Sequence, residues 1–275
     1  MLLSRRSAIK GMLVTAVGAV TGAATYGVAY ERHQIGVTHA SLPVSGLPPA
    51  LEGLRIGLLT DVHHSQTVPA SDVTHAVELV MAERPDLVVL GGDYVTFGDR
   101  AFVGPVAELL APLEAPHGVF AILGNHDDDR DMPAALSQRH IEVLKDARTR
   151  LEVRGEALEL AGVRFWTRRP EDIARVLRKA AADTVILLAH DPRRLTEASA
   201  LNVPAVLSGH THGGQVVLPG VGAVARRRFP VLAGLGSREN TSIFVSRGIG
   251  TVYVPVRINC PPEVAIITLK RRSPI

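Results

Sequence analysis

The sequence predicts an α/β fold in which two sheets form one domain. Uninterrupted apolar runs at 54–61, 86–93 and 118–127 alternate with helical patterns in the first half of the chain, and such runs are typical of strands covered on both faces of a sheet. The second half is rich in short strands, which indicates a second sheet packed against the first. About 240 residues follow the N-terminal segment, which suits one domain of this kind.

The elements are expected in a definite order. Residues 33–53 contain three prolines and little pattern, which predicts a linker or one edge strand. Strands at 54–61, 86–93 and 118–127 then alternate with helices at 71–84, 101–113 and near 133–139. Short strands at 141–144, 149–153 and 156–166 follow, then a helix at 170–182 and strands at 183–190 and 204–210. The stretches 215–218, 242–248 and 263–270 are strand-like.

Residues 1–32 are expected to be a targeting segment. Arg5 and Arg6 precede an uncharged run at 11–30, which is the charge pattern of an export signal. The order Ser4-Arg5-Arg6 with Lys10 resembles a twin-arginine signal and implies the twin-arginine export machinery as a partner. A removed signal and an uncleaved membrane anchor both fit the run. Positive charge before it predicts an extracytoplasmic domain, in the periplasm or on the outer face of the cytoplasmic membrane.

Composition narrows the chemistry. The single cysteine, Cys260, excludes a disulfide framework and any thiolate cluster. The net charge of +3 is small, with its basic residues in short clusters at 226–228 and 270–272, and aromatic residues make up only 4%. A nucleic-acid partner is therefore disfavoured, because little is available to stack on bases.

Polar side chains capable of binding metals follow five consecutive predicted strands. They are Asp61 and His63, then Asp93, then Asn125 and His126, then His190, and finally His210 and His212. A single aspartate at a strand end usually forms a turn. Five strand ends in succession, at the edge where α/β sheets place ligands, instead predict a metal site. The histidines at 33, 39, 75, 117 and 140 lack this context and are interpreted as ordinary.

Spacing and chemistry indicate two metal ions. Asp61 and His63 are two residues apart, as are His210 and His212, and residues i and i+2 of an extended backbone project to the same side. Carboxylate, imidazole and amide ligands without sulfur suit manganese, iron or zinc. About seven ligands are too many for one tetrahedral ion, so two divalent ions that share a bridging carboxylate are expected.

The ordered blocks D-x-H, G-D, G-N-H-D, H and G-H-x-H between Leu54 and about Gln215 resemble the calcineurin-like metallophosphoesterase superfamily. The ending at 244–269 resembles the exported or membrane-attached bacterial branch. The resemblance implies a four-layer αββα sandwich with two mixed sheets over residues 54–275. It also implies hydrolysis of phosphomonoester, phosphodiester or pyrophosphate bonds by metal-activated hydroxide.

The resemblance also assigns roles. One ion would be bound by Asp61, His63, Asp93 and His212, and the other by Asp93, Asn125, His190 and His210. His126 would be a catalytic acid or a phosphate stabiliser, and His64 would not be a ligand. Two departures stand out. Thr96 takes the place of an aspartate that orients the catalytic histidine in many relatives, leaving Asp127 and Asp99 as candidate partners of His126, and 165–172 lacks an expected Gly-Asp turn.

These features predict a metal-dependent phosphoesterase at the cell envelope, with lipid-linked esters among its candidate substrates. Three alternatives stay open. The first is a pyrophosphate hydrolase of the UDP-2,3-diacylglucosamine type, which acts in lipid A metabolism. The second is a nuclease or cyclic-nucleotide phosphodiesterase, and the third is a membrane-tethered metal-binding protein without activity.

Overall fold

The computed structural model describes residues 5–178, 184–223 and 228–272. Its first sheet has six strands in the order β1-β14-β2-β3-β4-β5. The strands are β1 (Gly36–Val44), β14 (Glu263–Arg271), β2 (Arg55–Leu59), β3 (Leu87–Leu90), β4 (Val119–Ala121) and β5 (Glu142–Val143). Strands β2 to β5 are parallel, whereas β14 runs antiparallel to β2 and parallel to β1. This sheet is therefore mixed.

The second sheet also has six strands, in the order β12-β13-β9-β8-β7-β6. They are β12 (Gly234–Arg238), β13 (Thr241–Val245), β9 (Ala205–Ser208), β8 (Thr184–Ala189), β7 (Glu156–Val163) and β6 (Ala147–Val153). The four central strands are parallel and the two outer strands are antiparallel to their neighbours. A small ribbon of β10 (Val217–Leu218) and β11 (Gly222–Ala223) lies outside both sheets.

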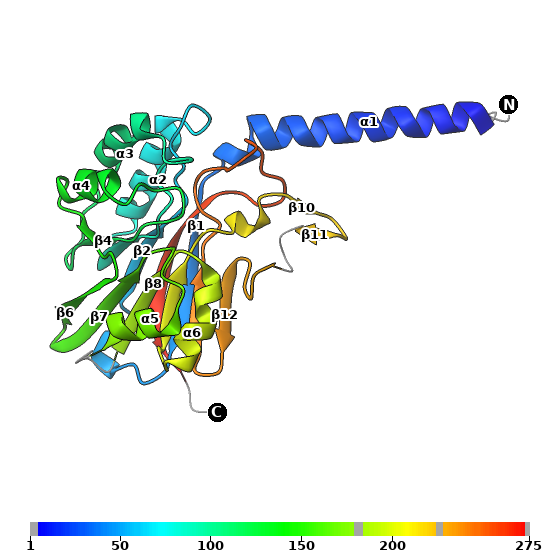
Figure 1. Ribbon diagram of the computed structural model, residues 1–275. Coiled ribbons are helices and arrows are strands. Elements are labelled where there is room, and N and C mark those ends of the chain that lie inside the picture. The colour runs from blue at the N-terminus through cyan, green and yellow to red at the C-terminus, as the bar shows by residue number, and fades with distance from the viewer. Residues whose placement is uncertain (1–4, 179–183, 224–227, 273–275) are drawn as a thin grey trace.

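Helices cover the outer face of each sheet (Figure 1). The first sheet is covered by α2 (Ala70–Ala82), α3 (Val103–Leu110) and α4 (Asp131–Ser137), and the second by α5 (Pro170–Leu177) and α6 (Leu195–Ala200). Single turns of 3-10 helix occur at η1 (Glu31–His33), η2 (Pro49–Leu51), η3 (Arg100–Phe102), η4 (Pro192–Arg194) and η5 (His212–Gly214). Each helix buries one apolar stripe, as Val73, Val77 and Val80 do on α2.

Three apolar cores separate four layers. Alternate residues of β3 face opposite sides of the sheet: Val88 packs beneath the outer helices, whereas Val89 packs in the core between the two sheets. The same alternation occurs on β8, where Ile186 faces the other sheet and Leu187 faces α5 and α6. Strands buried on both faces explain the uninterrupted apolar runs. The predicted sandwich of two mixed sheets between helical layers is confirmed.

Several elements differ from their predicted bounds. The expected strand at 118–127 is reduced to β4, because Gly124 and the Asn-His pair after it form a turn rather than extended chain. The expected helix at 101–113 begins as a 3-10 turn. The stretch at 33–53 contains β1, an edge strand. The end of the helix expected at 170–182, and part of the basic cluster at 226–228, lie outside the described residues.

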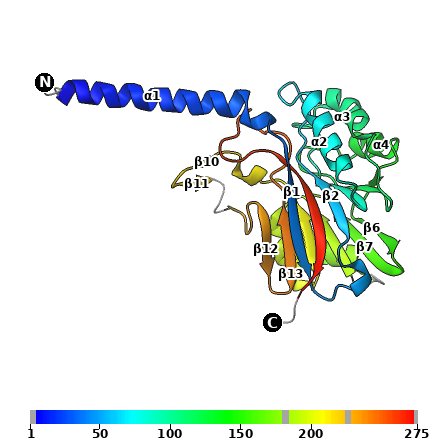
Figure 2. The ribbon, with the colours of Figure 1, turned by 180° about the vertical axis from the view of Figure 1, so that it is seen from behind.

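The helix α1 (Arg5–Ala29) stands apart from the sandwich. Figures 1 and 2 show it projecting from one side of the body. Its apolar side chains are largely exposed, including Met12, Val14 and Val20. In the described part of the chain, one helix near the N-terminus is long and apolar enough to cross a membrane, by length and composition.

Candidate metal centre

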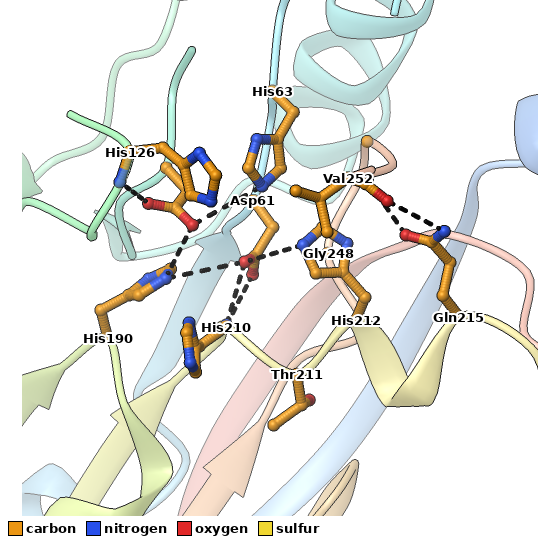
Figure 3. Close-up of polar contacts among 12 residues, drawn as sticks. Asp61, His63, His126, His190, His210, Thr211, His212, Gln215, Gly248 and Val252 are labelled. Atoms are coloured by element: carbon orange, nitrogen blue, oxygen red, sulfur yellow. Dashed lines mark hydrogen bonds and ion pairs between the residues drawn. The ribbon is translucent and has the colours of Figure 1, made fainter. Parts of the chain in front are cut away.

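Six of the seven predicted ligand side chains, all except that of Asn125, form two groups where the two sheets end side by side. Asp61 and His63 follow β2, Asp93 follows β3, Asn125 follows β4, His190 follows β8, and His210 and His212 follow β9. Strands β2, β3 and β4 are parallel, as are β8 and β9, so each sheet delivers its carboxyl ends to one edge. Figure 3 shows histidines from both sheets gathered around Asp61.

The side chains form two adjoining groups. Asp61, His63 and His212 make up the first, and Asp93, His190 and His210 the second; within each group the candidate ligand atoms lie within 4.8 Å of one another. The two groups adjoin at Asp93. Its Oδ2 lies 3.0 Å from His190 Nε2 and 3.6 Å from His63 Nε2, so this carboxylate faces histidines of both groups. Asp61 Oδ1 does so at longer range, 3.4 Å from His212 Nε2 and 3.8 Å from His190 Nε2. His210 and His212, although two residues apart, belong to different groups.

Polar atoms at the centre lack partners. His63 Nε2 and Asn125 Oδ1 are buried without a hydrogen bond, and a buried polar atom left in this way is costly. Divalent cations would satisfy these lone pairs, and the mixture of carboxylate, imidazole and amide suits manganese, iron or zinc. The centre therefore fits two His/Asp metal-binding groups, as expected for a dinuclear site.

Two histidines are oriented through their second ring nitrogen. His190 Nδ1 lies 2.7 Å from the carbonyl oxygen of Gly91, so this nitrogen carries the proton. His63 Nδ1 lies 3.2 Å from Thr96 Oγ1, and that hydroxyl is placed to donate to the His63 carbonyl at 3.4 Å. The ring nitrogen therefore donates to the hydroxyl oxygen. In both rings Nε2 faces the centre, which is the usual arrangement of metal-binding histidines.

The backbone at the centre is not extended. The prediction that Asp61 and His63, and His210 and His212, project to the same side because their backbone is extended is therefore wrong. Left-handed φ angles occur at Asp61 (52°), His63 (49°), Asp93 (59°), His210 (72°) and His212 (51°). Such conformations are uncommon for residues with a side chain and cluster at functional sites. Glycine is required close by, because a side chain at Gly209 would collide with the Asp61 carboxylate and one at Gly124 with that of Asp93.

Burial and the neighbouring carboxylates together set the protonation of the imidazoles. It lowers the pKa of His63 to about 3 and that of His210 to about 4, so both rings are neutral near pH 7 and can offer lone pairs. Burial would also lower the pKa of His190, but the charge and hydrogen bond of Asp93 outweigh it and raise that pKa to about 10. Burial raises the pKa of Asp61 to about 6. A bound cation would replace the proton that the carboxylates hold on His190.

His126 lies beside the first group, its ring centroid 4.9 Å from that of His63. Its Nδ1 accepts a hydrogen bond from the backbone N–H of Phe97 at 2.9 Å. The backbone N–H of His126 donates to Asp93 Oδ1 at 2.8 Å. An Nδ1 that accepts a hydrogen bond leaves the proton on Nε2. Burial lowers the pKa of His126, which favours the neutral ring.

The partner of His126 is therefore a backbone amide, and both candidate carboxylates have other roles. Asp127 accepts backbone N–H groups from Asp93, Tyr94 and Gly124, and thereby fixes the turns that carry the ligands. Asp99 caps η3 by accepting the Ala101 N–H. Thr96, which stands in the place of the expected aspartate, contacts His63. A backbone donor has no side-chain signature, so sequence reasoning did not find it.

The other histidines lie outside the two groups. His64 Nδ1 contacts the Val68 carbonyl at 2.9 Å, in keeping with its assignment as a non-ligand. His33 pairs with Asp72 at 2.7 Å and His39 with Glu83 at 3.1 Å. These are ordinary surface contacts.

The loop after β7 forms one wall of the centre. Phe165 packs against His210 with ring centroids 5.2 Å apart, and Trp166 beside it is 69% exposed. The guanidinium of Arg168 stacks over both aromatic rings at 5.1 and 5.0 Å. This loop lacks the expected Gly-Asp turn and instead supplies a buried phenylalanine, an exposed tryptophan and a cation.

Gln215 is a further functional residue that sequence reasoning missed. Its buried amide accepts the Val252 N–H at 3.0 Å and donates to the carbonyls of Val252 and Val254 (Figure 3). It thereby holds the loop that carries Tyr253. The only feature of the sequence that could have pointed to Gln215 is its place directly after the G-H-x-H-G-G motif.

Comparison with known proteins identifies the family. A model described as calcineurin-like phosphoesterase matches residues 54–214. The chain is 30% identical over 280 residues to "Uncharacterized metallophosphoesterase YkuE" of Bacillus subtilis, covering 98% of each protein. It is 32% identical over 234 residues to "Phosphodiesterase YaeI" of Escherichia coli, covering 78% of this chain and 82% of that protein. It is 31% identical to "Transmembrane protein with metallophosphoesterase domain" of Danio rerio, covering 98% of this chain and 64% of that protein.

Solved structures share the fold at low sequence identity. NAD nucleotidase of Haemophilus influenzae superimposes with a TM-score of 0.50 at 15% identity, covering 71% of this chain and 45% of that chain. Sulfate thiohydrolase SoxB of Thermus thermophilus gives 0.51 at 13% identity, covering 81% and 57%. The chain thus spans about half the length of these two proteins. The family model, the curated relatives and the two His/Asp groups agree: the chain belongs to the calcineurin-like phosphoesterase family and is a metallophosphoesterase.

Proposed function

We propose that this metallophosphoesterase hydrolyses phosphodiester bonds at the cell envelope with two divalent cations bound between the sheets. Asp61, His63, Asp93 and His212 would bind one, and Asp93, Asn125, His190 and His210 the other. The observation that carries the proposal is the pair of groups adjoining at Asp93. Two bound cations would lower the pKa of water and neutralise charge on the phosphoryl oxygens. Manganese, iron and zinc all suit the ligands.

His126 would donate a hydrogen bond from Nε2 to an oxygen of the phosphoryl group. Its Nδ1 is committed to the Phe97 N–H, so Nε2 carries the proton and the neutral ring acts as a fixed donor. A donor that is already oriented stabilises charge developing in the transition state without reorganisation. This tautomer supports His126 as a phosphate stabiliser, in preference to a protonated acid that would lose the Phe97 bond.

Two relatives support the diester bond and the location. The Escherichia coli relative is named a phosphodiesterase, and the Danio rerio relative is named a transmembrane protein. The exposed apolar helix α1 suits an anchor, with the twin-arginine pair at its start exposed. The enzyme would then act outside the cytoplasm on a phosphate ester at or near the membrane.

The proposal is tested by removing the carboxylate that both groups face. Asp93→Asn keeps the volume but removes the charge, and loss of a metal-bridging carboxylate should lower kcat/KM on a chromogenic phosphodiester with Mn²⁺ by at least about a thousandfold. Glu78→Gln is the matched control because it makes the same carboxylate-to-amide change on an exposed face of α2. It should keep wild-type activity. Equal rates for wild type and Asp93→Asn would rule the proposal out.

A further inference from the structure

A groove opens directly beside His126. It has a volume of about 600 Å³ and is lined by Ser65, Gln66, Thr67, Thr96, Phe97, Asp99, Phe102, Thr251, Val252, Tyr253, Val254 and Pro255. The rings of Phe97 and Tyr253 lie 5.0 and 6.5 Å from the His126 ring, and 5.7 Å from each other. A phosphoryl group at the metal centre would therefore have one substituent next to this pair of aromatic rings.

The two aromatic residues at the groove are held in place by the surrounding structure. Phe97 is 67% exposed and Tyr253 is 79% exposed, and both have left-handed φ angles of 53° and 63°. Such a conformation is unfavourable for a bulky residue and persists only where neighbours enforce it. Phe97 is fixed by its N–H bond to His126, and the loop of Tyr253 by the buried amide of Gln215.

The chemistry of the lining favours an apolar occupant. In the part of the chain that the structure describes, half of the lining side chains are aromatic, aliphatic or proline, and none is Lys or Arg. The one charged residue, Asp99, would repel an anion. A nucleic-acid backbone or a second phosphate needs cations that this groove lacks. A hydrocarbon chain needs only apolar surface and room.

The foot of α1, which comprises residues 27–32 at the end of α1 and the start of η1, is hydrogen-bonded to both sides of the groove. Arg32 Nη1 donates to the carbonyl of Thr67 at 2.8 Å on one side. On the other side the Gly27 carbonyl accepts the Arg257 N–H at 3.2 Å, and the Glu31 carboxylate accepts the Cys260 N–H at 2.7 Å. A side chain at Gly27 would collide with Val256, which directly follows the groove residues. The groove is thus fixed relative to the helix.

Exposed apolar side chains occur at the end of α1, in the groove and in the ribbon of β10 and β11. Tyr26, Tyr30, Val254, Leu218 and Val221 are each between 43% and 74% exposed, and β10 and β11 lie beneath α1 on the side from which it projects (Figures 1 and 2). A helix of 25 residues is about 37 Å long, enough for a hydrocarbon core of roughly 30 Å. Tyrosines at its end suit the membrane interface.

We propose that the groove takes the hydrocarbon chain of a membrane lipid phosphoester, whose phosphoryl group then lies at the metal centre. This inference rests on the proposed function and on α1 lying in a membrane. The substrate class is an amphiphilic phosphoester reached from the bilayer surface, with its apolar part packed against Phe97 and Tyr253. The other wall, with Phe165 against His210 and Arg168 over Trp166, lies on the His210 side of the centre and does not line this groove.

The test uses the Mn²⁺-loaded full chain in phosphatidylcholine nanodiscs and a series of 4-nitrophenyl alkyl phosphates that differ only in the alkyl chain. We expect kcat/KM to rise by about two- to fourfold per added methylene until the groove is filled. The ratio of kcat/KM for the octyl ester to that for the ethyl ester is the measured quantity. Partition of long esters into the bilayer would also raise this ratio, so wild type alone does not decide.

Two serine variants separate the groove from the bilayer. Val254→Ser removes an aliphatic group in the groove that is 53% exposed, and Leu235→Ser removes one on β12 that is 49% exposed. The octyl-to-ethyl ratio should fall at least fivefold in Val254→Ser and stay at the wild-type value in Leu235→Ser. Both sites are exposed, so folding should be kept, which circular dichroism checks.

The possible failures are distinguishable. A flat chain-length series in wild type, or equal ratios in the two variants, would overturn the lipid groove while leaving the phosphodiesterase intact, because the ethyl ester is still hydrolysed. Failure of wild type to hydrolyse any ester in the series would instead count against the proposed function on which this inference rests.

Discussion

At the scale of single residues, Thr96 acts on the metal centre through His63. Its hydroxyl lies 3.2 Å from His63 Nδ1 and 3.4 Å from the carbonyl of the same residue. The two contacts fix both the proton position and the rotation of the ring. The threonine in the place of the expected aspartate is thus an orienting group for a different histidine, and Phe97 N–H serves His126 instead.

Thr96→Val should weaken metal binding. The valine keeps the shape but leaves His63 Nδ1 without an acceptor, and loss of such an outer contact typically costs 10- to 100-fold in metal affinity. Mn²⁺ binding by isothermal titration calorimetry measures the change, and excess Mn²⁺ should restore much of the activity. Thr74→Val, an exposed change of the same type on α2, should bind like wild type. Equal affinity in both variants would show that Thr96 does not orient His63.

The identities of the candidate ligands could be predicted from sequence, whereas their geometry could not. Motif letters specify donor atoms directly, and the parallel strands bring these atoms to one edge. The left-handed turns at Asp61, His63 and His212 depend on nearby glycines and on contacts with distant segments. The periodicity of side chains along the chain carries no record of such contacts.

At the scale of elements, Asp146 fixes the loop that forms the aromatic wall. It precedes β6, and its carboxylate accepts the Arg164 N–H at 3.0 Å, Arg164 Nε at 2.6 Å and the Thr167 hydroxyl at 2.8 Å. These bonds hold the end of β7 and the start of the loop that carries Phe165 and Trp166. Burial alone would raise the pKa of Asp146, but the hydrogen bonds and the Arg164 charge keep it below the ordinary value of 3.8.

A carboxylate with a depressed pKa in the folded state stabilises the fold above its unfolded pKa. The contribution of Asp146 should therefore be complete above about pH 5, begin to fall near 3.8, and be lost as the pH falls through the lower pKa of the folded state. Asp146→Asn should lower the free energy of unfolding by about 1–3 kcal/mol at pH 6 and by much less at pH 3. Urea unfolding followed by circular dichroism at both values measures this.

The control for this prediction is another aspartate in an ion pair. Asp172→Asn breaks the exposed pair with Arg175 on α5 and should cost less than about 0.5 kcal/mol. A constant difference between wild type and Asp146→Asn from pH 3 to pH 6 would contradict the assigned role.

The elements themselves were largely predictable, because apolar runs and helical stripes are local signals. The position of β14 between β1 and β2 was not. It joins the last strand of the chain to two early strands, and no local pattern encodes a pairing across more than 200 residues, such as that of Gly36 with Glu263. The short strand β12 was also missed, because its sequence Gly234–Arg238 has little apolar character.

At the scale of the whole molecule, residues 246–262 connect the two sheets. They leave β13 of the second sheet, pass the metal centre and enter β14 of the first. On the way the Gly250 N–H donates to the Asp61 carbonyl at 2.7 Å, and Tyr253 projects at the groove. This one segment therefore links the sandwich, the centre and the foot of α1, to which Cys260 is bonded through Glu31.

Arg257 stabilises this segment from inside. It is fully buried, and its guanidinium donates to the carbonyls of Gly250, Cys260, Arg247 and Gly248 at 2.7 to 3.2 Å. A planar group with five donors can satisfy several carbonyls that a loop cannot pair by itself. The charge is stabilised by these dipoles, which replace the water lost on burial.

Arg257→Met should therefore lower the free energy of unfolding by at least about 3 kcal/mol, because a side chain of similar length leaves the carbonyls of Gly250, Cys260 and Arg247 without this donor. Urea unfolding of the full chain measures the loss. Arg238→Met, on the exposed strand β12, removes the same group from a solvated site and should cost less than about 0.5 kcal/mol. Similar stabilities for the two variants would mean that water or a rearranged loop satisfies these carbonyls. The connection between the sheets would then hold its shape without Arg257.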